Sequence, residues 1–110
     1  MKNSQLYKGS LGIIILKLLE DNGRMYGYEI TQRVKSLSGG KLNITEGALY
    51  PALHKLEAEG MLSVEAEKVD NRIRKYYKLT DTGETETANK LQELDAFIQN
   101  MQQLLKPKLA

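Results

Sequence analysis

Apolar positions repeat with the 3.6-residue period of an α-helix in the first part of the chain. After Ser10 they recur at i, i+3, i+4, i+7 and i+8, which gives a helix one apolar face. We expect Ser10 to cap this helix and Asn22-Gly23 to end it. The positions of the predicted face are Leu11, Ile14, Ile15, Leu18 and Leu19.

A second helix is predicted over residues 26–37, which read YGYEITQRVKSL. The run Ser38-Gly39-Gly40 should end it. Gly27 is a poor helix former, so either the backbone needs an unusual angle there or a neighbour packs closely, and we expect the packing. The predicted apolar face consists of Tyr26, Ile30, Val34 and Leu37.

The most unusual stretch is residues 43–60, NITEGALYPALHKLEAEG, a third predicted helix with Thr45 as its N-cap. One face carries Leu49, Leu53 and Leu56 and should be buried. The opposite face lacks the Glu and Lys side chains of an ordinary solvated helix. It carries Gly47, Pro51, His54 and Ala58, flanked by Tyr50 and Lys55.

Pro51 lies more than one turn inside this helix, where proline costs about 3 kcal/mol. Gly47, four residues earlier, can relax the carbonyl that the proline ring would strike. Such breaks of local rules tend to mark functional sites, and a helix start that is small and polar suits a DNA major groove. A kinked core helix with an idle outer face explains the same residues equally well.

Beyond Gly60 the period changes to two, which predicts two strands joined at Asp70-Asn71. The segment 68–78 holds five basic residues and one acidic residue, so the hairpin is basic. A two-stranded hairpin is not stable alone in water. We therefore expect four of its side chains to pack beneath the helices: Leu62, Val64, Tyr77 and Leu79.

Thr80 should cap a last helix of about 25 residues, which reaches about 37 Å. Its apolar positions are spaced alternately by three and four residues, as in a coiled-coil seam. A second copy of the chain is the partner that we expect for this seam, and the alternative is that the helix folds back on its own domain. The predicted dimer interface is Leu91, Leu94, Phe97, Ile98, Met101, Leu104 and Leu105.

Composition narrows the chemistry. The 110 residues include no cysteine and one histidine, which excludes disulfides and thiolate chemistry and argues against a His-based metal site. Neither a Gly-rich phosphate loop nor a base for a hydroxyl nucleophile other than His54 is evident, so we expect no enzyme, no cofactor and no metal. No stretch reads as a membrane span or signal peptide, which predicts a cytoplasmic protein.

Helix spacing alone leaves a helix-turn-helix as one candidate among several three-helix bundles. With the basic hairpin and the last helix, the pattern predicts a mostly α-helical fold with a small β-hairpin. This is a winged helix-turn-helix over residues 1–79, followed by a C-terminal dimerisation helix over residues 80–110. Three segments, YGYEI (26–30), GALYPALHKLEAEG (47–60) and RKYYKLTDTG (74–83), resemble the PadR family of bacterial transcriptional regulators.

The resemblance implies a homodimeric repressor that binds a palindromic operator in double-stranded DNA and is released by a small molecule or other signal. It points to Thr45, Gly47, Tyr50 and Pro51 as the DNA-reading end of the third helix. Tyr50 lies at the edge of the buried stripe, so a half-buried packing role is the alternative to the DNA contact that we expect. On the outer face of the helix, Lys55 is a candidate phosphate contact. His54 is either a phosphate contact or a solvated side chain without a special role. On the wing the resemblance places Arg72, Arg74 and Lys75, where basic side chains neutralise phosphates.

The chain also departs from the family pattern. The wing tip reads VDNRI (69–73) instead of a Gly- and Pro-rich turn. Some small members bind flat aromatic compounds between tryptophans, whereas this chain has no Trp and carries Leu94 at about that position, so the identity of any effector stays open. Three tyrosines are predicted to be structural at the junction of helix and wing, with contact to the DNA backbone as the alternative for the second of them: Tyr26, Tyr28 and Tyr76. A winged-helix module that contacts protein instead of DNA is the alternative function, because fold alone does not dictate DNA binding.

Overall fold

The computed structural model describes residue 7 and residues 9–106. The outermost parts of the two predicted domains, residues 1–6 and 107–110, lie outside the described residues, as does residue 8. Along residues 9–106 the elements are α2 (Leu11–Asn22), β1 (Arg24–Tyr26), α3 (Gly27–Leu37), α4 (Glu46–Ala58), β2 (Leu62–Val69), β3 (Arg72–Leu79) and α5 (Asp81–Leu105).

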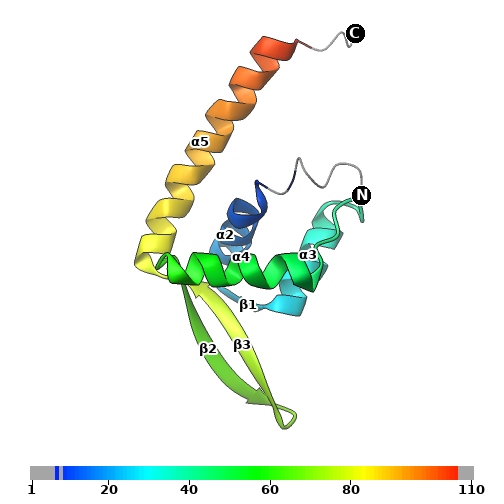
Figure 1. Ribbon diagram of the computed structural model, residues 1–110, viewed down its shortest axis with the longest axis vertical. Coiled ribbons are helices and arrows are strands. Elements are labelled where there is room, and N and C mark those ends of the chain that lie inside the picture. Colours follow the sequence, from blue (N-terminus) through cyan, green and yellow to red (C-terminus); the bar gives the residue numbers. More distant parts are fainter. Residues whose placement is uncertain (1–6, 8, 107–110) are drawn as a thin grey trace.

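Figure 1 shows α2, α3 and α4 as a helical body from which two elements project. The β2–β3 hairpin leaves on one side, and α5 rises on the other side from the end of α4. The sheet is antiparallel, with strand order β1-β3-β2. These elements are the winged helix-turn-helix and long final helix that the sequence predicts.

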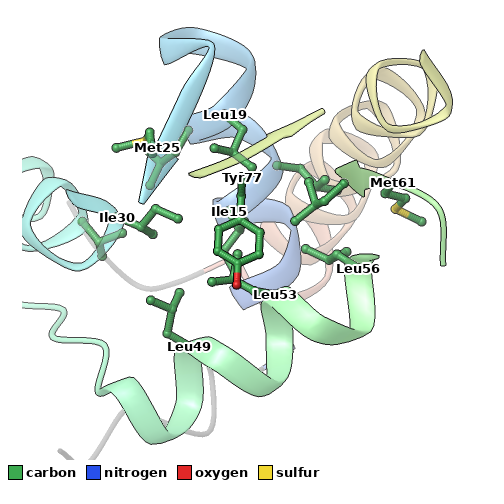
Figure 2. Packing of buried hydrophobic residues seen from close by; sticks show 13 residues of the cluster. Ile15, Leu19, Met25, Ile30, Leu49, Leu53, Leu56, Met61 and Tyr77 are labelled. Carbon is green, nitrogen blue, oxygen red and sulfur yellow. The ribbon is translucent and has the colours of Figure 1, made fainter. Parts of the chain in front are cut away.

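The core is built around α2, which packs against α4, α5 and β3. Because these neighbours cover α2 on several sides, it buries a wider arc than the single predicted face: Leu16, outside that face, is 0% exposed. Leu49 and Leu53 of α4 are also fully buried and Leu56 nearly so, as predicted. Figure 2 shows these three leucines pointing from α4 toward the ring of Tyr77 in the middle of the cluster.

The second helix ends where the sequence predicts but starts one residue later, and its predicted apolar face is wrong at Leu37. Residues Arg24–Tyr26 form the strand β1, which pairs with β3 so that Tyr26 lies opposite Tyr76. At the other end, Leu37 is 70% exposed and takes no part in the buried face. The helix therefore buries only Gly27, Ile30 and Val34. It ends at Leu37, directly before the Ser38-Gly39-Gly40 run, as predicted.

The hairpin follows the prediction. Asp70 and Asn71 form its two-residue turn with φ of 50° and 63°, the left-handed angles that a tight hairpin turn of this hand requires. Of the four side chains expected beneath the helices, Leu62 and Tyr77 are buried, whereas Val64 and Leu79 are half-buried against the core.

Two of the three predicted N-caps are confirmed. The hydroxyl oxygen of Thr45 accepts a hydrogen bond from the Ala48 amide at 3.2 Å, and that of Thr80 accepts one from the Gly83 amide at 3.0 Å. Ser10 occupies the N-cap position of α2, but its side chain makes no capping bond. The reason is conformational: Ser10 has ψ of −1°, whereas Thr45 and Thr80 have the extended backbone that aims a side chain at the first turn.

The second half of α5 keeps its apolar seam in solvent. Phe97 and Ile98 are 58% and 45% exposed, and Leu104 and Leu105 are 78% and 65% exposed. Leu91, Leu94 and Met101 are half-buried. Among residues 9–106, no helix is both long and apolar enough to cross a membrane.

Candidate nucleic-acid interface

The outer face of α4 is open, as the sequence predicts. Thr45 and four residues of the helix, Gly47, Pro51, His54 and Lys55, are all exposed. The helix runs through Pro51 without interruption from Glu46 to Ala58. Gly47, Ala48 and Pro51 therefore leave the backbone of its first turns open to a large ligand, and Glu46 is the one acidic side chain of the first turn.

Tyr50 is the half-buried member of the predicted reading set, and it packs against Gly27 at the start of α3. A Cβ atom at Gly27 would lie 2.9 Å from Tyr50 Cζ and closer still to the hydroxyl oxygen. Glycine is required there for space, which confirms the predicted close packing. The contact also fixes α4 against α3, since the ring of Tyr50 cannot move inward.

Two grooves flank α4 and divide the predicted residues between them. The wing groove lies between α3, α4 and the hairpin, and it takes in Tyr50, Arg72, Arg74 and Lys75 together with Tyr26, Tyr28 and Tyr77. The stem groove lies between α2, α4 and α5, and it takes in Gly47, Pro51 and Lys55 together with Leu11, Lys90 and Leu94. Thr45 and His54 line neither groove, although His54 lies beside Tyr50 with ring centroids 6.4 Å apart.

The basic residues that line the wing groove come from both faces of the sheet, because successive side chains of a strand point to opposite faces. Tyr77 is buried against the helices, so Lys75, two residues earlier on β3, belongs to the same face of the sheet. Arg74 and Tyr76 belong to the other face. Lys75 is exposed, whereas Arg74 is half-buried.

The outer face of the sheet carries a stack of aromatic and guanidinium groups. The guanidinium of Arg24 lies 4.0 Å from the ring centroid of Tyr76, and that of Arg74 lies 4.1 Å from the ring centroid of Tyr26. The two rings meet edge to face at 5.5 Å. Arg24 also pairs with Glu67 at 2.6 Å. Cation–π contacts of this kind contribute about 0.5–1 kcal/mol each at exposed sites, so the stack holds the wing against β1.

The predicted role of the three tyrosines at this junction is confirmed for two of them. Tyr26 and Tyr76 meet in the stack, whereas Tyr28 is 65% exposed at the edge of the wing groove and takes no part in the stack. It lies in the first turn of α3, where its ring projects from the helix. Arg24 and Glu67 could not be predicted from the sequence, because their pairing depends on β1, and β1 carries no alternating pattern of its own.

Nowhere in the described residues do three or more His, Asp or Glu side chains gather closely enough to hold an ion.

The comparison with known proteins identifies the family. Residues 15–89 match the profile described as "Transcriptional regulator PadR-like family". The chain belongs to this family. It is thus a transcriptional regulator and not an enzyme, as the sequence predicted. The transcriptional regulator Rv3488 of Mycobacterium tuberculosis is 36% identical over 93 residues, which cover 82% of this chain and 83% of that protein.

Solved structures of PadR-like proteins and other regulators share the fold. A transcriptional regulator from Clostridium thermocellum superposes with a TM-score of 0.81 at 25% identity, covering 96% of this chain and 99% of that one. PadR of Bacillus subtilis, solved in complex with operator DNA, superposes with a TM-score of 0.68 at 32% identity. That match covers 74% of this chain and 46% of the longer Bacillus protein.

Proposed function

We propose that this regulator is a homodimeric repressor that binds a palindromic operator in double-stranded DNA and is released by a small molecule or other signal. The observation that carries DNA binding is the open face of α4 beside a basic wing, on a fold shared with a PadR protein solved on operator DNA. In this proposal residues 1–79 read the DNA and residues 80–110 join two copies.

The first turns of α4 would enter the major groove, because the exposed Gly47, Ala48 and Pro51 let the backbone approach base edges. Thr45, Gly47, Tyr50 and Pro51 form the reading end. Lys55 and His54 would contact phosphates farther along the helix. Phosphate contacts position a protein on the duplex, and base contacts select the sequence.

The wing would add sequence-independent affinity. Arg72 and Lys75 are exposed cations of β3, next to the tight turn and on the helix side of the sheet respectively, which suits contact with a phosphate chain. Arg74 is stacked on Tyr26, so we assign it mainly to holding the wing in place.

Dimerisation rests on the apolar seam of α5. Four of its seven predicted side chains are more than 40% exposed. A contiguous apolar stripe on a projecting helix marks an association surface. A second copy related by a two-fold axis would cover the stripe and place two copies of α4 about 34 Å apart, one turn of the duplex.

The test is an electrophoretic mobility shift with DNA from upstream of the gene of this chain, followed by nuclease footprinting. The proposal expects a footprint over an inverted repeat and lower expression of a reporter placed behind it. A random duplex of equal length is the control for non-specific binding. Equal affinity for both duplexes across salt concentrations would contradict sequence-specific binding to an operator. A winged-helix module that contacts protein would then be the better explanation.

A further inference from the structure

The end of α4 is fixed to the residue that follows it. Gly60, with φ of +80°, ends the helix as its amide donates to the Glu57 carbonyl, and the Met61 amide donates to the Leu56 carbonyl, both at 3.0 Å. This pair of bonds is the Schellman arrangement that satisfies the last carbonyls of a helix. Met61 is itself only 9% exposed, in the same cluster as Leu56. The Met61 carbonyl is therefore part of the rigid body that contains α4.

The start of α5 is tied to the same two residues. The Thr80 amide donates to the Met61 carbonyl at 3.0 Å, and the Thr80 hydroxyl donates to the Gly60 carbonyl at 2.6 Å. The same hydroxyl oxygen accepts the bond from the Gly83 amide that caps α5. One side chain thus joins the end of α4 to the first turn of α5.

Gly83 then lies directly on the backbone of Met61. A Cβ atom at Gly83 would stand 3.0 Å from the Met61 carbonyl carbon and would overlap its oxygen. The obstacle is backbone, which cannot rotate away as a flexible side chain can. Gly83 has no left-handed φ, so the requirement for glycine is one of space. One turn later the buried hydroxyl of Thr87 donates to the Gly83 carbonyl at 2.7 Å. We call this set of contacts between the end of α4 and the start of α5 the joint.

We infer that the contact of Gly83 with Met61 determines the spacing between the two DNA half-sites that the homodimer accepts. The inference rests on the proposed function, since it requires two copies joined through α5. The joint sets the angle at which α5 leaves α4, and the seam of α5 sets where the two copies meet. The distance between the two copies of α4 follows from that angle.

The length of α5 makes the spacing sensitive to this contact. Fifteen residues separate Gly83 from Ile98 in the middle of the seam, which is about 22 Å of helix. A tilt of about 10° at the joint would move each reading helix by about 4 Å relative to the seam, more than the 3.4 Å rise of one base pair. A merely destabilising change at Gly83 would instead weaken binding to every spacing alike.

The first test measures spacing preference. The unaltered chain selects its half-site from a random duplex pool, and a series of duplexes then varies the distance between two such half-sites in steps of one base pair. Gly83→Ala should move the preferred spacing by at least one base pair or change the affinity ratio between adjacent spacings by about fivefold or more. Thr85→Ala, an exposed substitution in the same part of α5, is the matched control and should keep the original preference.

The second test needs no DNA. Because the chain has no cysteine, Ala58→Cys, on the exposed face of α4, takes a single spin label. The label-to-label distance in the dimer should shift or broaden in Gly83→Ala. Thr80→Val, which removes both hydroxyl bonds of the joint, should do the same, and Thr80→Ser should restore the original distance.

The outcomes separate the two proposals. If the unaltered chain stays monomeric and gives no dipolar signal, the homodimer fails and this inference fails with it. If the chain dimerises and Gly83→Ala keeps both the distance and the preferred spacing, the inference is overturned while the proposed function stands. Should Gly83→Ala not fold, Thr80→Val decides: an unchanged distance and spacing would overturn the inference.

Discussion

Gly27 and Gly47 lie in the first turns of two neighbouring helices, α3 and α4, and differ in the space around them. Gly27 is buried beneath the ring of Tyr50, whereas Gly47 is exposed and a Cβ atom there would meet only the Thr45 hydroxyl, at 3.9 Å. The sequence shows two glycines of equally poor helix propensity. Only the structure reveals that one makes room inside the protein and the other leaves room outside it.

The two positions therefore give opposite results on substitution. Gly47→Ala should raise the free energy of unfolding by about 0.5 kcal/mol through better helix propensity, and at the same time weaken operator binding, because the new methyl group faces the DNA. Gly27→Ala should lower the free energy of unfolding by about 1–3 kcal/mol through overpacking against Tyr50. Urea unfolding and operator titration measure both effects. Undiminished operator affinity in Gly47→Ala would contradict a close approach of α4 to DNA.

Tyr77 links the core to alkaline pH. Burial raises the pKa of its phenol above the ordinary value of 10.0, and Glu57 and Tyr50 add to the effect. The folded chain thus holds this proton to a higher pH than the unfolded chain does. Stability from this source is complete below about pH 10 and falls as the pH rises further, because only the unfolded state then loses the proton freely.

Tyr77→Phe keeps the ring and removes the titrating hydroxyl. We expect its free energy of unfolding to fall less between pH 8 and pH 10.5 than that of the unaltered chain, measured by urea unfolding at each pH. Tyr28→Phe removes a phenol that is 65% exposed and should keep the full decrease. An identical decrease in Tyr77→Phe and the unaltered chain would show that the buried phenol does not contribute.

At the scale of elements, the sequence predicts those helices and strands whose own residues show a periodic apolar pattern or a turn or capping residue. The alternation of apolar and polar residues and the pair Asp70-Asn71 predict the hairpin. The leucine stripe and the Thr45 cap predict α4. β1 could not be found this way, because three residues become a strand only by pairing with β3, about fifty positions away in the sequence. The stack of Arg24 and Arg74 on tyrosines could not be predicted from the sequence for the same reason. The division of the candidate site into two grooves likewise depends on tertiary placement.

The two faces of the wing should behave differently toward salt. Lys75→Ala should weaken binding to all sequences and reduce the slope of log affinity against log salt by about 0.9 per subunit, as expected for one lost phosphate contact. Arg74→Ala should change the slope less, because its guanidinium lies on Tyr26, and should instead loosen the wing. Titrations of operator and random duplex at four salt concentrations measure both slopes. An unchanged slope in Lys75→Ala would remove this residue from the phosphate contacts.

At the scale of the whole molecule, affinity depends on α5 although α5 touches no base in the proposed complex. Two DNA-binding domains joined at a fixed distance bind a palindrome as one unit, because the second domain meets its half-site at a high effective concentration. A single DNA-binding domain has only the affinity of its own contacts. Disrupting the seam should therefore lower operator affinity far more than the loss of any one wing contact, while the fold of each DNA-binding domain stays intact.

Ile98→Asp tests this directly, because Ile98 lies in the middle of the seam, is 45% exposed in the single chain and would be buried between two copies. A carboxylate in a desolvated interface is strongly unfavourable unless it is paired, so the variant should sediment as a monomer at micromolar concentration. Its far-ultraviolet dichroism should stay close to that of the unaltered chain, since the core does not include Ile98. Operator affinity should fall about 100-fold or more. Gln103→Glu, an exposed change on the opposite side of α5, should alter neither the mass nor the affinity. A dimeric Ile98→Asp with full affinity would place the contact between copies elsewhere on the chain.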